Sequence, residues 1–270
     1  MMRQRVLPLL FIILFLWGNI VGAATPPPQV GAEAAVLMVA NTKQILFSKN
    51  PGGIMYPAST TKIMTLITAL EKGDPNSIVT VSPRAAACDG SSLELHTDDK
   101  LSLSNAMYGM MLVSGNDAAE AIAENVAGSI PLFVNMMNGN AEKIGAKNTR
   151  FSNPHGLPDP YNHYTTAYDL ALITNYAMQN KEFVKIVSSR EYDVTFLNGK
   201  KTHVSNTDKL LKTYPGANGV KTGYTDAAGD CLVAGAKRGG VQLIAVILND
   251  DYRWDDAAKL LDYGFGQVGL

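Results

Sequence analysis

Apolar residues near both ends of the chain form short unbroken runs of the length of a β-strand. One run covers residues 34–40, and the polar residues 41–43 separate it from a second strand-like segment at 44–48. Two more runs cover residues 230–236 and 241–248. Runs of this length with turn residues between them are typical of β-hairpins. The pattern therefore predicts one hairpin near each end of the chain.

Further signals surround the second of these hairpins. Its turn is the basic tetrapeptide Lys237-Arg238-Gly239-Gly240, whose two glycines suit a tight connection. We expect one more strand before it, over residues 217–222, and a closing helix after it, over residues 255–263. The C-terminal part of the chain thus predicts three strands followed by a helix.

The middle of the chain has a helical spacing instead. Apolar side chains recur there every three or four residues, which places them on one face of a helix. Thr166 and Asp169 stand three residues apart before one such segment, as in a capping box. The other expected helices cover residues 59–70, 103–113, 118–126 and 130–144. The first of these should be buried on most of its sides.

Strands at both ends and helices between them predict an α+β fold. We expect the strands from both ends to share one antiparallel sheet flanked by helices, and the middle of the chain to form a helical lobe. The cleft between the sheet and the lobe is the expected place for a binding site.

The first residues differ from the rest of the chain. Two arginines precede a short apolar run, and small residues follow it. This order is that of a secretory signal peptide, and the run is short for a membrane-spanning helix. We therefore expect a signal peptide over residues 1–24, a proline-rich spacer over 25–33 and one domain over 34–270. An uncleaved membrane anchor is the alternative.

Composition is that of a globular protein without a nucleic-acid partner. Hydrophobic residues make up 46% of the 270 residues, charged residues make up 17%, and the net charge is −1. These values allow a hydrophobic core and show no excess of positive charge with which to bind nucleic acid. With only Cys88 and Cys231, the chain has no disulfide framework. We expect two unpaired, largely buried thiols, with one bridge as the alternative.

The four histidines are widely spaced along the chain. Their spacing does not resemble that of metal ligands, which come in close groups. We therefore expect them to be structural or surface residues, with His155 in a turn, and we expect no bound metal.

Candidate chemistry lies in three short motifs that follow one another along the chain. Each alone is common, as Ser48-Lys49-Asn50 shows by fitting the second pattern in an unrelated place. The evidence is the ordered set, with each member in a fitting local context. The motifs are Ser59-Thr60-Thr61-Lys62, Ser114-Gly115-Asn116 and Lys221-Thr222-Gly223.

The first motif supplies a candidate nucleophile and its base. Ser59 and Lys62 stand at positions i and i+3 of a predicted helix and so share one face. A serine hydroxyl is a weak nucleophile until a base takes its proton, and a lysine amine is a base only when its pKa is lowered. Burial and a nearby cation, for which Lys221 is the candidate, both lower it. The alternative is a helix-capping serine before a surface lysine.

The second motif lies in a predicted loop between two helices. Ser114 is placed to relay a proton between Lys62 and a leaving amine. Asn116 has both donor and acceptor groups with which to hold a substrate amide. Ordinary turn chemistry is the alternative, because serine, glycine and asparagine all favour turns.

The third motif stands at the end of a predicted strand. Lys221 supplies positive charge, Thr222 supplies a hydroxyl, and Gly223 allows another backbone to approach closely. This set suits a substrate that ends in a free carboxylate. The alternative is an exposed lysine at a strand end.

Together the motifs resemble those of the penicillin-recognising serine enzymes. Within that group the chain is similar to the serine D-alanyl-D-alanine carboxypeptidases, the low-molecular-mass penicillin-binding proteins. The resemblance extends over residues 34–265. Further segments carry it: Tyr56-Pro57-Ala58, Leu112-Val113, Asn153-Pro154-His155-Gly156-Leu157, Gly219-Val220, Tyr224-Thr225 and Leu260-Leu261-Asp262-Tyr263-Gly264-Phe265.

This resemblance implies the fold of serine β-lactamases and DD-peptidases and a specific reaction. Ser59 would attack the last peptide bond of a peptidoglycan stem peptide, release D-alanine and leave an acyl-enzyme for water to hydrolyse. Backbone N–H groups of Ser59 and Tyr224 would form the oxyanion hole. Lys221 and Thr222 would hold the terminal carboxylate, and β-lactams would acylate Ser59 as inhibitors. No metal or cofactor is implied.

The resemblance also implies a location and a departure. Such an enzyme works outside the cytoplasmic membrane, in the periplasm or cell wall, and contacts the membrane only if the N-terminal segment is uncleaved. Many family members continue into a small β-rich domain and a membrane anchor, whereas this sequence ends at Leu270. We therefore expect a catalytic domain over residues 34–270 without a C-terminal β domain. Tyr224 stands where some relatives carry histidine.

Two rival functions differ in what they need from the sequence. A serine β-lactamase with a deacylating glutamate would carry that residue between the second and third motifs. Residues 148–181 contain no glutamate, and their only carboxylates are Asp159 and Asp169, the latter expected to cap a helix. A non-catalytic penicillin-binding or wall-binding module would be expected to have lost part of the catalytic set, which is complete here.

Overall fold

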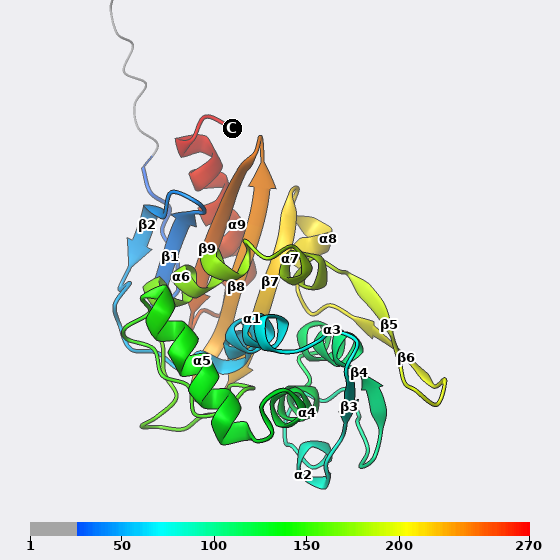
Figure 1. The fold of residues 1–270 in the computed structure, drawn as a ribbon. Coiled ribbons are helices and arrows are strands. Elements are labelled where there is room, and N and C mark those ends of the chain that lie inside the picture. Colours follow the sequence, from blue (N-terminus) through cyan, green and yellow to red (C-terminus); the bar gives the residue numbers. More distant parts are fainter. Residues whose placement is uncertain (1–25) are drawn as a thin grey trace, which may run out of the picture.

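A five-stranded antiparallel sheet forms the centre of the computed structural model, which describes residues 26–270 (Figure 1). The strand order is β2-β1-β9-β8-β7, so strands from the two ends of the chain lie side by side. Ala34 pairs with Leu248 where β1 meets β9. The predicted shared sheet is therefore confirmed. The bounds are β1 Ala34–Val39, β2 Gln44–Lys49, β7 Ala217–Thr225, β8 Gly229–Arg238 and β9 Val241–Leu248.

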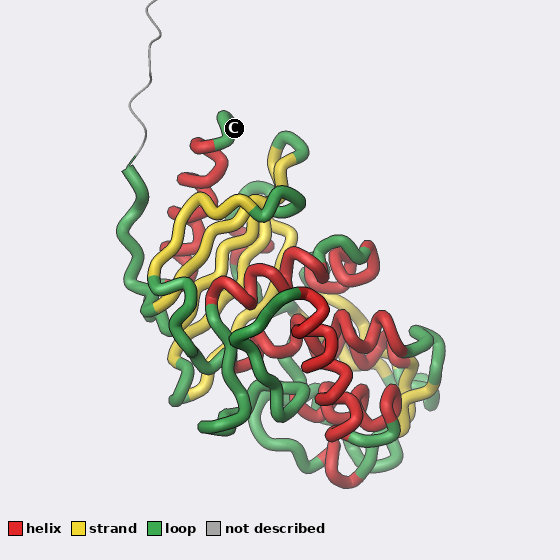
Figure 2. Tube along the Cα trace, turned by 60° about the vertical axis from the view of Figure 1, so that its left-hand side comes forward, coloured by secondary structure: helices red, strands yellow, loops and turns green. Residues whose placement is uncertain are grey.

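Helices cover both faces of this sheet (Figure 2). On one face, Leu37 and Val39 of β1 pack with residues of α9, which spans Arg253–Gln267. Their neighbours Val36 and Met38 pack on the opposite face, in the larger core shared with the helical part of the chain. Because both faces are covered, the central strands are unbroken apolar runs instead of alternating ones.

The helical lobe is built around α1, which spans Lys62–Lys72. Residues 62–69 of this helix are all buried, which confirms the prediction that it is covered on most sides. It contacts four other helices of the lobe and also α7 and strand β7. Those helices are α3 Leu103–Leu112, α4 Asn116–Ala127, α5 Ile130–Ile144 and α6 Ala167–Ala177, and α7 spans Lys181–Val187.

The expected helix at residues 59–70 does not begin as an α-helix. A 3₁₀ turn, η1, covers Ala58–Thr61 and leads into α1. In a 3₁₀ turn the side chains at positions i and i+3 lie directly above one another. The turn therefore brings Ser59 over Lys62, the pair that the first motif singled out.

The capping box predicted at Thr166 is half formed. The Thr166 hydroxyl accepts a hydrogen bond from the backbone N–H of Asp169 at 3.0 Å and starts α6. The carboxylate of Asp169 does not return this bond, because it accepts from the Asn148 N–H and the Thr149 hydroxyl instead. The reciprocal half of the prediction is therefore wrong, since a tertiary contact competes for the carboxylate.

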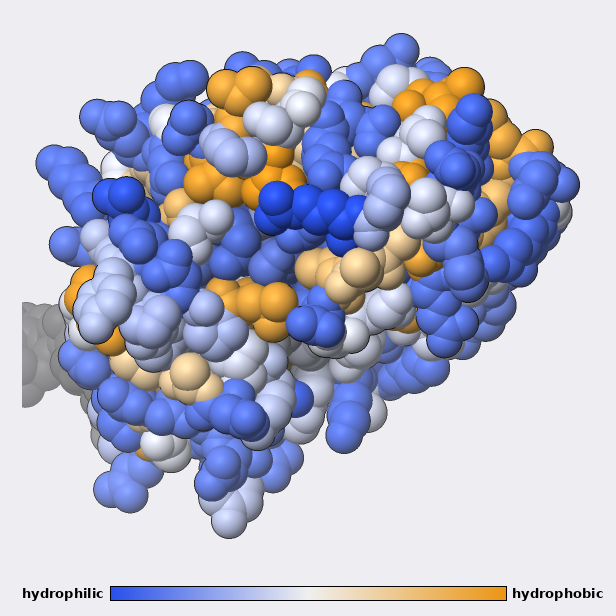
Figure 3. All heavy atoms as spheres, turned by 90° about the horizontal axis from the view of Figure 1, so that it is seen from below, coloured by the Kyte–Doolittle hydropathy of each residue, from blue (hydrophilic) through white to orange (hydrophobic). Residues whose placement is uncertain are grey.

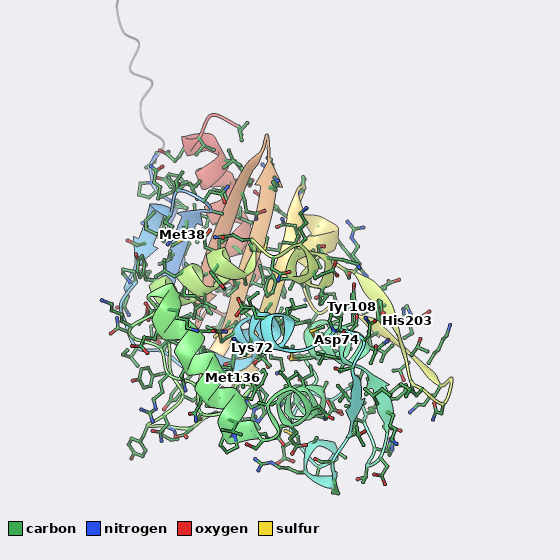
Figure 4. The ribbon with its side chains drawn as sticks, in the orientation of Figure 1. Met38, Lys72, Asp74, Tyr108, Met136 and His203 are labelled. Atoms are coloured by element: carbon green, nitrogen blue, oxygen red, sulfur yellow. The ribbon has the colours of Figure 1, made fainter. Side chains whose placement is uncertain are left out.

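Several short elements were not predicted. They are β3 Ile78–Thr80, β4 Lys100–Ser102, β5 Glu191–Thr195, β6 Lys201–Ser205, α2 Pro83–Ala86 and α8 Leu210–Thr213, together with α7. The β5–β6 hairpin is mostly polar, and packing on the lobe holds it in place: Tyr108 of α3 stacks on Tyr192 with ring centroids 3.7 Å apart. Figure 4 labels Tyr108 beside the hairpin that carries His203.

The chain before β1 has no regular secondary structure in its described part. The Gly31 N–H bonds to the Asp256 carboxylate at 2.6 Å, which ties residues 26–33 to α9. The predicted signal peptide, residues 1–24, lies outside the described residues, so that prediction and the domain bounds built on it stay predictions. No helix within residues 26–270 is long and apolar enough to cross a membrane.

The underside of the molecule, as oriented in Figure 1, is mixed in character. Seen from below, it is mostly hydrophilic, with separate apolar patches between polar side chains (Figure 3). Such scattered patches are ordinary for a globular surface and do not mark a site by themselves.

The packing of α9 on the sheet gives a stability prediction. Leu260 is fully buried between α9 and the strands, so Leu260→Ala removes apolar contacts and leaves a cavity. We expect a loss of about 2–5 kcal/mol in the free energy of unfolding, measured by urea titration. The matched control is Gln267→Ala on the exposed face of the same helix, expected to change it by less than about 0.5 kcal/mol. Equal effects of the two substitutions would contradict the packing described here.

Candidate active site

Two glycines bring other backbone segments against the turn that carries Ser59. A Cβ atom at Gly156 would clash with the carbonyl oxygen of Ala58, and Gly156 has φ +100°. A Cβ atom at Gly223 of β7 would lie 3.1 Å from the Ser59 nitrogen. Only glycine fits such close approaches easily. The Ser59 backbone is thus held between β7 and the loop of residues 153–157.

The amine of Lys62 lies at the centre of the site. Its side chain is fully buried, and its Nζ has three hydrogen-bond partners. They are Ser59 Oγ at 2.9 Å, Asn116 Oδ1 at 2.7 Å and the backbone oxygen of His155 at 2.9 Å. The predicted contact between Ser59 and Lys62 is therefore present, and the alternative of a surface lysine is wrong.

The chemistry of these partners fixes the direction of the lone pair when Lys62 is neutral. The oxygens of Asn116 and His155 only accept hydrogen bonds, so each must receive an N–H from Lys62. A neutral amine has two N–H groups, and both are then used. The remaining lone pair faces the Ser59 hydroxyl, which is the arrangement that a general base needs.

Burial is also what makes the neutral amine available. Loss of hydration holds the pKa of Lys62 well below its usual value, and the positive charge of Lys221 lowers it further. Both causes were expected from the sequence. A lysine with such a pKa loses its proton far more readily than a surface lysine does.

Ser114 lies in the turn between α3 and α4, with φ +64°. A serine in this left-handed region costs on the order of 1–3 kcal/mol, and Ala58, next to the nucleophile, is also left-handed at φ +45°. In the described part of the chain, no hydrogen bond joins the Ser114 hydroxyl to Lys62. Ser114 does line the same pocket as Ser59.

Asn116 is the first residue of α4 and not a loop residue as predicted. Its Oδ1 accepts from Lys62, and its Nδ2 donates to the Asp89 backbone oxygen at 2.7 Å. One amide hydrogen of Asn116 is left over after these bonds. The side chain therefore orients Lys62 first and has one donor with which to meet a ligand.

The third motif lies inside β7, not at its end, because the strand continues to Thr225. Lys221 is buried, and its Nζ donates to the Thr222 backbone oxygen at 3.1 Å. The Thr222 hydroxyl is 2.8 Å from the Thr207 hydroxyl and lines the pocket. Thr207 is a neighbour that sequence reasoning missed.

Two further charged groups, Asp208 and Arg253, lie near enough to Lys221 to affect its pKa. Burial lowers the pKa of Lys221 to about 7, although the carboxylate of Asp208 raises it in part, and Arg253 lowers it. Burial raises the pKa of Asp208 to about 7. Oδ2 of Asp208 and Nε of Arg253 are buried and have no hydrogen-bond partner within residues 26–270. The site thus holds charges that its own hydrogen bonds do not fully satisfy.

A pocket of about 290 Å³ opens over Ser59, between β7 and the turn that holds Ser114. The pocket lies in the cleft between the sheet and the helical lobe, where a binding site is expected. Tyr224 is 60% exposed at the pocket, and its hydroxyl bonds to Asp226. The lining residues are Ser59, Ser91, Val113, Ser114, Thr207, Lys209, Thr222, Gly223, Tyr224, Arg253 and Trp254.

A second group of polar side chains includes His155, whose backbone oxygen bonds to Lys62. No motif in the sequence indicated this group. Ligand atoms of Cys88, Glu120 and His155 lie within 4.8 Å of one another. Glu120 also accepts a hydrogen bond from Arg84 at 3.2 Å. The spacing of the histidines along the chain did not indicate this group, because side chains from distant parts of the chain meet only in the fold. His155 does lie in a bend, as predicted.

The two cysteines are unpaired, as predicted. Cys231 is fully buried, whereas Cys88 is only partly buried. Burial raises the pKa of Cys88 to about 12 and that of Cys231 to about 11, and nearby carboxylates add to the effect at Cys88. Both thiols are therefore protonated and unreactive near neutral pH.

Comparisons with known proteins agree with this geometry. A sequence profile described as D-alanyl-D-alanine carboxypeptidase, family S11 of the peptidases, matches residues 21–252. The chain is 37% identical over 244 residues to the D-alanyl-D-alanine carboxypeptidase DacF of Bacillus subtilis, covering 87% of this chain and 62% of that protein. It is 32% identical to DacB2 of Mycobacterium tuberculosis, covering 90% of this chain and 85% of the relative.

Solved structures give the same result. The DD-transpeptidase of Streptomyces K15 superimposes with a TM-score of 0.85 at 32% identity, over 90% of this chain and 100% of that one. The predicted α+β fold of the DD-peptidases is therefore confirmed. The chain spans less than two thirds of the length of the first two curated relatives, 62% and 63%.

Proposed function

We infer that this chain, which belongs to the D-alanyl-D-alanine carboxypeptidase family, is an exported serine peptidase that removes the terminal D-alanine from peptidoglycan stem peptides. The observation that carries the proposal is the environment of Lys62. The lone pair of its buried amine faces Ser59. Ser59 lines a pocket that is also lined by β7, the strand that carries Lys221. This arrangement fits a serine nucleophile that acts on a substrate with a free carboxylate.

The proposed acylation step follows from the hydrogen bonds of Lys62. Ser59 Oγ attacks the carbonyl carbon of the last peptide bond, and its proton moves to the Lys62 lone pair. The C–N bond then breaks, and the departing D-alanine nitrogen takes up a proton, for which Ser114 is the proposed relay. The product is an ester on Ser59, which water hydrolyses to restore the hydroxyl and release the shortened peptide.

Two sets of groups bind the substrate in this proposal, one at the reacting carbonyl oxygen and one at the terminal carboxylate and amide. The Gly223 backbone lies against the Ser59 nitrogen. The N–H groups of Ser59 and of Tyr224, the residue after Gly223, are the proposed donors to the developing oxyanion. Two such donors suit an oxyanion hole. The positive charge of Lys221 and the Thr222 hydroxyl hold the terminal carboxylate, and the remaining amide N–H of Asn116 donates to the substrate amide.

The proposed location is the outer side of the cytoplasmic membrane, in the periplasm or cell wall, because stem peptides are exposed there and the N-terminal pattern is that of a signal peptide. The proposed partners are the stem peptide and, as inhibitors, β-lactams. No metal or cofactor takes part in the steps above, and no nucleic acid is proposed as a partner.

The rival β-lactamase reading remains disfavoured by the carboxylates around the site. Asp159 is partly buried in a loop, where its Oδ1 accepts from the backbone N–H groups of Tyr161 and Asn162, and Asp169 accepts from Asn148 and Thr149. Glu120, which lies outside residues 148–181, has one oxygen near Arg84 and the other near His155. None of these three carboxylates lines the pocket over Ser59, where water would have to attack an ester.

The first test concerns the nucleophile and its base. Fluorescent penicillin is expected to label the wild type and not Ser59→Ala. Lys62→Ala is expected to acylate more slowly by a factor on the order of 10²–10⁴, because the general base is lost. The matched control is Lys72→Ala at the exposed end of the same helix, labelled in Figure 4, which is expected to acylate at the wild-type rate. Labelling that survives Ser59→Ala would show that the mechanism is wrong.

The second test separates a peptidase from a β-lactamase by the fate of the ester. D-Alanine leaves the pocket after acylation by peptide, whereas the leaving group of a penicillin stays attached and blocks the path of water. We expect a long-lived penicilloyl adduct on Ser59 in intact-protein mass spectrometry, together with steady D-alanine release from a diacetyl-L-Lys-D-Ala-D-Ala peptide. Rapid repeated hydrolysis of penicillin without an adduct would favour the β-lactamase instead.

The third test uses the titration of the two lysines. Lys62 must be neutral to act as a base, and Lys221 must be protonated to hold a carboxylate. The ratio kcat/KM for peptide is therefore expected to rise with pH through the lowered pKa of Lys62 and to fall above about 7, where Lys221 loses its proton. Asp208→Asn removes a charge that raises the pKa of Lys221, so the falling limb should move to lower pH.

This variant keeps the local structure, because the asparagine Oδ1 still accepts the Leu210 N–H that Asp208 accepts at 2.9 Å. The measurement is kcat/KM for peptide across a pH series in wild type and variant at equal ionic strength. A falling limb that stays in place or moves to higher pH in Asp208→Asn would contradict the proposed role of Lys221.

A further inference from the structure

A chain of polar contacts runs from the surface to the amine of Lys62. Arg84 Nε donates to one carboxylate oxygen of Glu120 at 3.2 Å. The other oxygen of Glu120 lies 3.4 Å from Nε2 of His155. The backbone oxygen of His155 then accepts a hydrogen bond from Lys62 at 2.9 Å. Glu120 and His155 are both buried, whereas Arg84 is largely exposed.

The protonation of the His155 ring follows from its neighbours. Its Nδ1 accepts a hydrogen bond from the Leu157 N–H at 3.2 Å, so the proton of the neutral ring is on Nε2 and faces Glu120. Burial lowers the pKa of His155, which keeps the ring neutral. Burial raises the pKa of Glu120, but the hydrogen bonds from His155 and Arg84 outweigh it and lower the pKa. The pair is thus a carboxylate facing an imidazole N–H.

The same tautomer argues against a metal ion among Cys88, Glu120 and His155. A metal on Nε2 would require the ring proton to sit on Nδ1, opposite the Leu157 N–H that already donates there. The cluster therefore suits a hydrogen-bonded positioning network better than a metal site.

We propose that Glu120 is a positioning residue that, through the ring of His155, holds the backbone oxygen that orients the general base Lys62. The inference rests on the proposed function, in which Lys62 activates Ser59. It adds a residue outside the three motifs that controls the rate of acylation without touching the substrate.

The step from the His155 ring to its backbone oxygen depends on the loop of residues 153–157. This loop is held by local bonds: Asn153 Oδ1 accepts the N–H of Gly156 at 2.7 Å, and Thr65 of α1 donates to the Pro154 oxygen at 2.6 Å. Gly156 also packs against the backbone of Ala58. The Glu120 contact joins the His155 ring of this loop to α4.

Loss of that contact affects the reaction through the geometry of Lys62. Without Glu120, the Nε2–H of His155 is buried with no acceptor, and the ring must turn to find one. Turning the ring breaks the hydrogen bond from the Leu157 N–H to Nδ1 of His155. It also shifts the backbone oxygen of His155, which accepts an N–H of Lys62. The lone pair then no longer points steadily at Ser59, and displacements of this kind reduce a catalytic rate.

The experiment compares three variants with the wild type. Glu120→Ala removes the acceptor, whereas Glu120→Gln keeps an oxygen that can accept from His155. Glu124→Ala removes a half-buried carboxylate one turn later on the same helix, for which the structure shows no hydrogen bond within residues 26–270, and serves as the control. The sites of each preparation are counted with fluorescent penicillin at saturation, so that rates refer to folded, reactive enzyme.

Three quantities are measured: the rate constant for acylation by penicillin, kcat and KM for D-alanine release, and hydrogen–deuterium exchange of residues 153–158. For Glu120→Ala we expect acylation and kcat to fall on the order of tenfold at unchanged KM, with faster exchange in the loop. Glu120→Gln is expected to restore the rate to within about twofold of the wild type, and Glu124→Ala to match it.

The results separate this inference from the proposed function. Acylation and loop exchange in Glu120→Ala that equal the wild type would overturn the inference. So would a Glu120→Gln variant as slow as Glu120→Ala, because the charge and not the hydrogen bond would then matter. A wild-type enzyme that reacts with penicillin but releases no D-alanine would instead overturn the peptidase assignment, while acylation and exchange still decide the role of Glu120.

Discussion

The burial of one lysine amine is the constraint on which the rest of the site depends. A charged ammonium inside a protein is costly, so the fold must either leave Lys62 neutral or surround it with acceptors. This structure does both: three oxygens lie within 2.9 Å of the amine, and burial holds its pKa well below the usual value. Two of the three partners can only accept, and they come from different parts of the chain. Their fixed positions turn a buried, destabilised amine into a base aimed at one hydroxyl.

Such an arrangement requires a rigid and fully covered helix, which the fold supplies through α1. Helices on several sides and the sheet beyond them exclude water from the amine. The 3₁₀ turn at its start stacks Ser59 over Lys62, and Gly156 and Gly223 allow two other backbones to hold that turn from either side. The left-handed backbone at Ala58 and Ser114 adds local strain beside the reacting groups. The cost is met by the large apolar cores on the two faces of the sheet.

The sequence revealed what depends on local pattern. Unbroken apolar runs predicted the strands of the sheet because both its faces are covered, and the i, i+3 spacing of Ser59 and Lys62 predicted their contact. Short polar elements such as β5 and β6 were missed, since a stacked tyrosine pair and not their own hydrophobicity holds them. Glu120, His155 and Asp208 were missed for a related reason. Their roles come from contacts across 35 or more residues, or from burial, and neither leaves a mark at fixed spacing in the chain.

The two active-site lysines must be in opposite states, and their surroundings explain how one pocket achieves this. Among residues 26–270 no carboxylate bonds to Lys62, and Lys221 adds a repelling charge, so Lys62 gives up its proton first. Lys221 has Asp208 near it, which partly restores its proton affinity against burial. In the unfolded chain both amines would be protonated at neutral pH, so folding releases protons from them. Stability from these two groups is therefore lowest in acid and rises with pH from the folded pKa values toward the unfolded ones. Burial of the two lysines therefore lowers the free energy of unfolding at neutral pH. The same burial places one neutral and one charged lysine in a single cleft.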